Sequence, residues 1–145
     1  MSNKEIVLTG IKAWEANDVQ ELAPLVADDF VLTGPLPQPL GKNEFIGLMQ
    51  ATLTAMPDWS FNVTDVREDG DKVTLKSYIT GTHTGELALP GMPPVPATGK
   101  KVVLPEEKHE YTLKDGKLVR LVVESPPDGG VPGMLAQIGV TLPQA

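Results

Sequence analysis

The sequence predicts an α+β domain, in which three helices from the N-terminal half pack on a mostly antiparallel sheet from the C-terminal half. Apolar residues recur at helical spacing up to residue 57, alternate with polar residues after it, and two Asp-Gly pairs separate the alternating runs. A chain of 145 residues suits one domain. No repeat or linker divides it, so we expect one domain over residues 1–145.

The three helices are expected in order along the first 57 residues. Apolar residues recur at helical spacing in the range 4–14, and Asp18 then suits an N-cap with Glu21 three residues on. A short strand, DDFVLTGP, follows at residues 28–35 and stops at its Gly-Pro pair. The run GKNEFIGLMQATLTAMP, residues 41–57, gives the third helix, which ends at its final proline because proline cannot continue a helix.

Two hairpins are expected in the second half. The alternating runs WSFNVTDV and KVTLKSYITGTHTG are joined by REDGD, whose Asp-Gly pair is a strong hairpin signal. The second hairpin, KHEYTL-KDGK-LVRLVVE, turns at Asp115 and Gly116. A Pro-rich loop, LPGMPPVPATGK, lies between the hairpins and cannot be a central strand.

The second hairpin decides which side chains share a face. A two-residue turn pairs Tyr111 with Arg120, His109 with Val122, and Glu107 with Glu124, all on one face. The other face, which would be exposed or form a dimer, holds Lys108, Glu110, Thr112, Val119, Leu121 and Val123. A slip of one residue would exchange the two faces, and we favour the first register.

Both histidines fall on faces that build the core. The apolar parity that begins at Val73 reaches Gly81 and then His83, so this ring either lines the mouth of a cavity or ties down the Pro-rich loop. His109 could donate a hydrogen bond to an enolate, or could be a wall residue bonded to a neighbouring carbonyl.

Composition narrows the function classes. Nineteen acidic and twelve basic residues give a net charge of -7, which repels phosphate backbones and anionic lipid, so we expect no nucleic-acid and no membrane partner. Without a signal-peptide core we expect a cytoplasmic protein. The chain has no cysteine, no HExxH and no nucleotide fingerprint, so we expect neither a metal nor a cofactor.

Four motifs in order, GTHTGE, PATGKKVVLP, DGKLV and GMLAQIGV, resemble those of SnoaL-like polyketide cyclases and predicted ester cyclases, within the nuclear-transport-factor-2-like superfamily. The resemblance covers nearly the whole chain. It implies a cystatin-like cone, in which a strongly curved sheet carries the three helices on its concave face around a pocket. It also implies acid/base catalysis without metal or cofactor, and a homodimer through the outer sheet face.

The last strand departs from that family pattern. Such cyclases usually carry a Trp and, four residues later, a catalytic Asp, where this sequence has Val122 and Pro126. Glu124, of the same parity, could replace the missing acid, and so could Asp128 if its segment turns inward.

The resulting hypothesis is an enzyme that moves protons on a small apolar carbonyl compound, by aldol cyclisation or isomerisation. Glu107 and Glu124, if enclosed, would leave a carboxylic acid beside a carboxylate, assisted by His109 and His83; if the hairpin end is wet, both are solvated. The expected pocket-lining residues are Trp14, Phe30, Phe45, Leu48, Met49, Met56, Trp59, Ile79, Tyr111, Arg120 and Val122.

Two other functions stay open. A non-catalytic member would use the pocket for ligand binding or protein interaction, which the missing Asp favours. Epoxide hydrolysis would need two Asp residues bridged by an Arg; Arg120 shares the expected face, but no Asp does.

Overall fold

The computed structural model describes residues 1–34, 38–89 and 92–140. Its elements are α1 (Asn3–Glu15), α2 (Val19–Leu22), the 3-10 turn η1 (Ala23–Leu25), β1 (Val26–Thr33), α3 (Lys42–Ala55), β2 (Thr64–Asp69), β3 (Lys72–Ser77), β4 (Thr80–Thr82), β5 (Lys101–Val103), β6 (Glu107–Lys114), β7 (Lys117–Glu124) and α4 (Gly130–Gln137). Pro35, the expected end of the first strand, and residues 90–91 of the Pro-rich loop lie outside the described residues.

Local sequence signals set the helix ends. The side chain of Asp18 accepts a hydrogen bond from the backbone N–H of Glu21 at 3.1 Å, which confirms the predicted N-cap of α2. Ser2 caps α1 in the same way, through the N–H of Glu5. Helix α3 ends at Ala55, two residues before Pro57.

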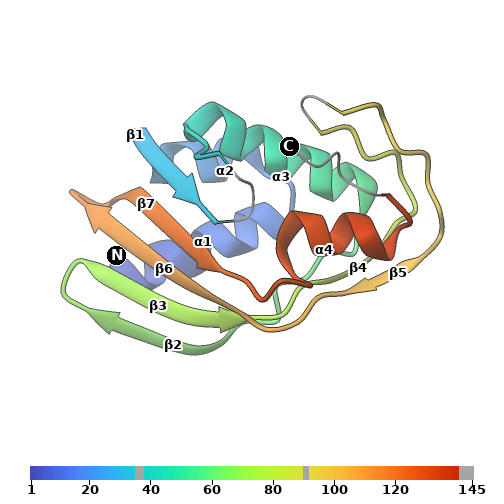
Figure 1. Ribbon diagram of the computed structural model, residues 1–145. Helices are drawn as coiled ribbons and strands as arrows, with labels where there is room; N and C mark the ends of the chain where they lie inside the picture. The colour runs from blue at the N-terminus through green and yellow to red at the C-terminus, as the bar shows by residue number, and fades with distance from the viewer. Residues whose placement is uncertain (35–37, 90–91, 141–145) are drawn as a thin grey trace.

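The main sheet has five strands in the order β1-β7-β6-β3-β2. Strand β1 runs parallel to β7, and the other neighbours are antiparallel. Helices α1, α2 and α3 lie on one side of this sheet, and α4 lies at its end near the β4–β5 ribbon (Figure 1). The predicted fold class, α+β with a mostly antiparallel sheet, is confirmed.

The predicted strand of residues 72–85 divides into two. It leaves the main sheet after Ser77, and Thr80–Thr82 pairs instead with Lys101–Val103 of the segment after the Pro-rich loop. The predicted face survives this break, because alternate residues stay buried along the whole run: Val73, Leu75, Ser77, Ile79, Gly81 and His83. This face looks into the layer between sheet and helices.

A β-bulge in the second hairpin overturns the expected register. The turn at Asp115 and Gly116 forms as predicted, with both residues at positive φ. The partners then shift between Leu118 and Arg120, so that Val119 is an extra residue on β7. Every later β7 side chain therefore changes face relative to the prediction.

The shifted register gives new cross-strand partners. Tyr111 pairs with Leu121, His109 with Val123, and Lys108 with Glu124. Leu121 and Val123, expected on an outer dimer-forming face, are buried in the core. The pairs Tyr111–Arg120, His109–Val122 and Glu107–Glu124 are not formed.

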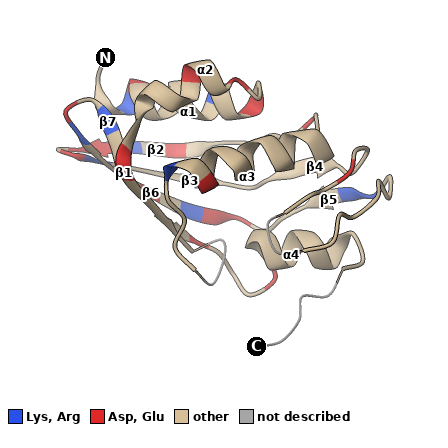
Figure 2. Cartoon of the chain, turned by 90° about the horizontal axis from the view of Figure 1, so that it is seen from above, with Lys and Arg blue, Asp and Glu red and all other residues tan. Residues whose placement is uncertain are grey.

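Charged side chains lie mainly on the strands, turns and helix ends, whereas α4 carries none (Figure 2). Its residues Val131, Met134 and Leu135 are buried and join the core cluster that also includes Val7 of α1 and Phe45 of α3. This helix was not predicted from the sequence. It closes the end of the layer between α1–α3 and the sheet (Figure 1).

Two glycines provide a test of this packing. The backbone N–H of Gly85 donates to the carbonyl of Ala55, and a Cβ at Gly85 would collide with the carbonyl oxygen of Thr54, so Gly85→Ala should destabilise the fold by about 1–3 kcal/mol. Gly47, in the interior of α3, has open space around it, so Gly47→Ala should stabilise by about 0.5–1 kcal/mol. Urea unfolding of both variants checks this, and equal effects would contradict the placement of Gly85 against α3.

Candidate functional site

Strand β6 brings three polar side chains into the interior. Glu107, His109 and Tyr111 alternate along the strand and therefore point to the same face, toward the helices. They are only 5%, 3% and 5% exposed. A buried glutamate and histidine are uncommon unless they are paired, so their partners determine what this cluster can do.

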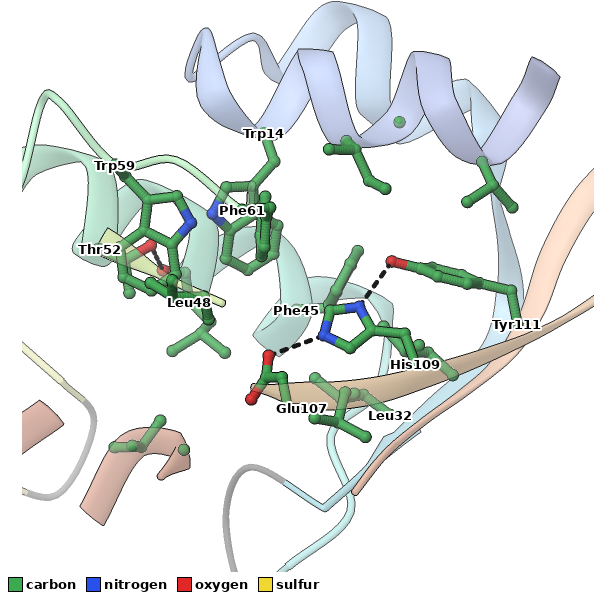
Figure 3. A pocket seen from close by; sticks show the side chains of 18 of the residues that line it. Trp14, Leu32, Phe45, Leu48, Thr52, Trp59, Phe61, Glu107, His109 and Tyr111 are labelled. Carbon is green, nitrogen blue, oxygen red and sulfur yellow. Dashed lines mark hydrogen bonds and ion pairs between the residues drawn. The ribbon is translucent and has the colours of Figure 1, made fainter. Parts of the chain in front are cut away.

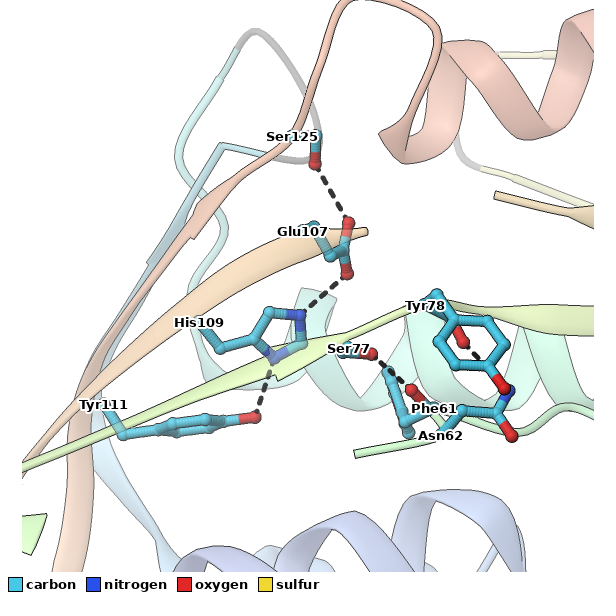
Figure 4. Close-up of polar contacts among 8 residues, drawn as sticks. All are labelled: Phe61, Asn62, Ser77, Tyr78, Glu107, His109, Tyr111 and Ser125. Atoms are coloured by element: carbon cyan, nitrogen blue, oxygen red, sulfur yellow. Dashed lines mark hydrogen bonds and ion pairs between the residues drawn. The ribbon is translucent and has the colours of Figure 1, made fainter. Parts of the chain in front are cut away.

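The three side chains form a continuous hydrogen-bonded row (Figure 4). His109 Nε2 lies 2.7 Å from Glu107 Oε1, and His109 Nδ1 lies 3.2 Å from the Tyr111 hydroxyl. The hydroxyl of Ser125, just beyond β7, donates to the other carboxylate oxygen of Glu107 at 2.9 Å. Each polar group of the row thus has a partner, and the carboxylate keeps unused acceptor sites.

The burial of Tyr111 fixes the protonation state at one end of the row. Burial, and secondarily the negative charge of Glu107, raise the pKa of the Tyr111 phenol above its usual range, so it stays protonated. The protonated phenol can donate to Nδ1 of His109, and in the tautomer that permits this the Nε2–H of His109 donates to Glu107. The arrangement leaves the Glu107 carboxylate as the acceptor at the end of the row.

These groups stand in the wall of a mainly apolar cavity of about 80 Å³ between the sheet and the helices (Figure 3). On the measure of about 10–15 Å³ for one water, the cavity has room for several waters or a small organic molecule. Its lining comprises Val7, Gly10, Ile11, Trp14, Leu22, Leu32, Phe45, Leu48, Thr52, Trp59, Phe61, Ile79, Leu104, Glu107, His109, Tyr111, Leu118, Leu121, Val123, Gly130, Val131 and Met134.

The remaining polar atoms of the wall come from the helix side. Thr52 donates its hydroxyl proton within α3, to the carbonyls of Leu48 and Met49, at 2.9 and 3.1 Å. The indole nitrogens of Trp14 and Trp59 are buried and have no hydrogen-bond partner in the described part of the chain. The cavity therefore offers an acid/base row on the sheet side and two N–H donors on the helix side.

His83 lies apart from this cavity. Its side chain is 0% exposed and does not line the cavity wall. Its Nδ1 lies 2.9 Å from the Thr98 hydroxyl and accepts from the Thr98 backbone N–H at 3.3 Å. His83 thus ties down the end of the Pro-rich loop, which was one of its two expected roles. Burial lowers its pKa.

The structure separates the predicted pair of glutamates. Arg120, Val122 and Glu124 lie on the outer face of β7, because the bulge at Val119 turns them away from the helices. Arg120 and Glu124 are exposed, and Val122 is half-buried. The prediction that Arg120 and Val122 line the pocket is wrong, and Glu124 does not meet Glu107. Asp128, the other substitute considered for the missing acid, is also exposed.

The structure distributes the other predicted pocket residues between wall and core. Those that line the cavity are Trp14, Phe45, Leu48, Trp59, Ile79 and Tyr111. Phe30, Met49 and Met56 are buried but not in the lining; Phe30 packs behind Phe45, with ring centroids 4.8 Å apart.

Several residues that line the cavity or bond to its wall were not predicted from the sequence. Phe61 alternates with Trp59 in a run that was expected to be a strand, so parity alone could have placed it beside Trp59. Ser125 gave no signal, because it follows the end of β7 and reaches Glu107 only through tertiary structure. Helix α4, whose Val131 and Met134 line the cavity, gave no signal either.

Across the described ranges, no group of three or more His, Cys, Asp or Glu side chains could hold a metal ion. In the same ranges, no helix is long and apolar enough to cross a membrane.

The helices on a curved sheet, with a cavity between them, form a fold like that of nuclear-transport-factor-2-like proteins. An NTF2-like protein from Cytophaga hutchinsonii superposes with a TM-score of 0.63, at 19% identity over 88% of this chain and 92% of that one. The chain belongs to the SnoaL-like domain family, whose model matches residues 7–121. This membership confirms the resemblance inferred from the four sequence motifs.

Two solved structures cover nearly all of the chain. IdmH, a proposed polyketide cyclase from Streptomyces antibioticus, is 25% identical with a TM-score of 0.71, covering 97% of this chain and 100% of that one. AclR, a proposed hydroxylase from Streptomyces galilaeus, is 24% identical with a TM-score of 0.73, covering 94% and 95%. No curated protein matches the chain.

The lowered pKa of His83 predicts a pH effect on stability. Because the unfolded histidine takes up a proton near its ordinary value of 6.5 while the folded one resists it, the free energy of unfolding should fall as pH drops from about 7 through and below 6.5. Urea unfolding at several pH values between 7.5 and 5.5 measures this slope. His83→Gln should flatten the slope. Any contribution of His109 is the same in the parent chain and in this variant, so the difference in slope reports His83 alone. An unchanged slope would contradict the prediction.

Proposed function

We propose that this chain catalyses cofactor-independent proton transfer on a small, largely apolar carbonyl compound, by aldol-type cyclisation or isomerisation. The observation that carries this proposal is the buried His109–Glu107 pair, 2.7 Å apart, in the wall of an otherwise apolar cavity. Membership of the SnoaL-like family supports it, and so does the description of IdmH as a proposed polyketide cyclase.

Glu107 is the base in this proposal. Its carboxylate accepts from His109 and Ser125 and still has free acceptor sites for a substrate proton. The two donors fix its orientation, and the apolar wall around it excludes most of the water that would compete with a substrate C–H for the carboxylate. In this proposal His109, held by Tyr111, donates a hydrogen bond that offsets the negative charge of the Glu107 carboxylate.

The proposed reaction conserves protons. The C–H bond beside the carbonyl breaks, its proton passes to Glu107, and its electron pair forms an enolate. In a cyclisation the enolate carbon bonds to a second carbonyl carbon of the same molecule, whose oxygen takes up the proton; in an isomerisation the proton returns to another carbon. In either case Glu107 ends as it began, and nothing is oxidised or reduced.

The family's usual acid, an Asp on the last strand, has no counterpart in this proposal. Glu107 on β6 takes its place, one strand away, because the outward turn of β7 removes Glu124 from the cavity. A homodimer through the outer sheet face stays a prediction from the family resemblance.

Exchange of deuterium at the α-carbon tests the chemistry without knowledge of the natural substrate. The chain is incubated in D₂O with a panel of small apolar ketones and β-keto esters, and loss of the α-proton signal is followed by NMR. Glu107→Gln and His109→Gln should lower the accelerated exchange by about 10²–10⁴-fold, the usual worth of a general base. Glu124→Gln, on the outer face, is the matched control and should exchange like the parent chain.

The same exchange experiment distinguishes this enzyme from a second candidate, a non-catalytic binding protein. That candidate is favoured by the mutual hydrogen bonding of Glu107, His109 and Tyr111, which already satisfies these groups without a ligand. If panel members bind the folded chain but their exchange is not accelerated, or if Glu107→Gln exchanges as fast as Glu124→Gln, the catalytic proposal fails.

A further inference from the structure

Two unused hydrogen-bond donors stand in the cavity wall opposite the acid/base row. Trp14 and Trp59 are each 7% exposed, and their indole nitrogens are buried without an acceptor in the described residues. Buried polar groups are nearly always hydrogen-bonded, and an orphaned donor costs stability. Two such donors in one wall therefore require an explanation, which neither the fold nor the row formed by Glu107, His109 and Tyr111 supplies.

The two indoles are neighbours although they come from different elements. Trp14 lies in the last turn of α1, and Trp59 follows the end of α3. Their ring centroids are 6.4 Å apart with an angle of 39° between the planes, and Figure 3 draws the nitrogen-bearing edges facing one another. Phe61 packs edge-on against both rings and holds them in place.

The chemistry of the indole restricts what can satisfy it. An indole N–H donates only, so its partner must be an acceptor, and neither donor carries a charge. The wall between them and the sheet is largely apolar, so a strongly hydrated anion such as phosphate would lose more in desolvation than two neutral donors return. A carbonyl oxygen, or the enolate oxygen formed from it, meets these conditions.

We infer that Trp14 and Trp59 form a two-donor site for one oxygen of the bound molecule, so that the ligand points its carbonyl oxygen to the helix side and the C–H beside that carbonyl to the sheet side. This inference rests on the proposed function, because it assigns the binding of the substrate oxygen to one side of the same cavity. Donors placed where charge develops bind an enolate oxygen more strongly than a ketone oxygen, and so favour the proton transfer to Glu107.

The test uses the fact that the chain has only two tryptophans. A ¹⁵N-labelled sample gives two indole N–H signals, which Trp14→Phe and Trp59→Phe assign. The probes are cyclohexanone and methylenecyclohexane, which share size and shape but differ in the acceptor oxygen. Cyclohexanone should move both indole proton signals downfield in a saturable titration, whereas methylenecyclohexane should bind, as seen in the cavity methyl signals, without that shift.

Affinity provides the second measurement. Each Trp→Phe variant keeps an aromatic ring and loses the donor, so it should weaken cyclohexanone binding by about three- to tenfold and leave methylenecyclohexane binding nearly unchanged. Equal losses for both probes, indole signals that respond alike to both, or failure of cyclohexanone to bind would each overturn the two-donor site.

The readout separates this inference from the proposed function. Indole shifts need no turnover and can be recorded on Glu107→Gln as well as on the parent chain. Downfield shifts without accelerated α-exchange would keep the donor site and reject catalysis. Accelerated exchange that depends on Glu107, with no specific indole response, would keep catalysis and reject the donor site.

Discussion

The single extra residue at Val119 controls which carboxylate the cavity contains. Before it, Leu118 points into the core; after it, Leu121 and Val123 do the same, although an unbroken strand cannot place residues 118 and 121 on one face. The bulge thus lets β7 bury three apolar side chains and turn Glu124 outward. The interior receives one glutamate rather than two, and that glutamate lies beside a histidine.

This difference changes the electrostatic logic of the site. Two facing carboxylates would repel each other and share a proton. Glu107 instead has a histidine beside it, which can donate a hydrogen bond and which also carries an opposite charge whenever its imidazole is protonated. A buried pair of this kind is seldom retained for stability, because apolar residues of similar size would avoid the desolvation cost. Ser125 and Tyr111 give each end of the row a partner, so its geometry is fixed before any ligand enters, and the carboxylate keeps acceptor sites for that ligand.

Much of the fold was predictable because it depends on local periodicity. The burial of Glu107, His109 and Tyr111 followed from alternation along β6, and the burial of His83 from alternation that survives even the break after Ser77. The bulge was not predictable in this way, since Leu118, Val119, Leu121, Val122 and Val123 are all apolar and give either face a plausible pattern. Arg120 was the available signal, because an arginine between two buried leucines must point away from the core.

Features that depend on contacts distant in sequence escaped prediction. Helix α4 begins without a side-chain cap and contains two glycines and a proline, so little in its sequence favours a helix; it is stabilised by burying Val131, Met134 and Leu135. The parallel placement of β1 beside β7 and the reach of Ser125 to Glu107 arise in the same way. These long-range contacts bring α4 and Ser125 to the cavity, while the local pattern supplies most of the residues that line it.

The cavity is polar in two places that come from different layers. The sheet contributes acceptor capacity and a mobile proton through Glu107 and His109, and the helix layer contributes only donors, through Trp14 and Trp59. A molecule that satisfies both must direct an acceptor oxygen to the indoles and a removable proton to Glu107, and must be apolar elsewhere. A carbonyl compound with acidic hydrogens beside the carbonyl carries these two groups on adjacent carbons. The fold alone hosts many activities, so the feature that distinguishes this chain is the division of donors and acceptors across one apolar space.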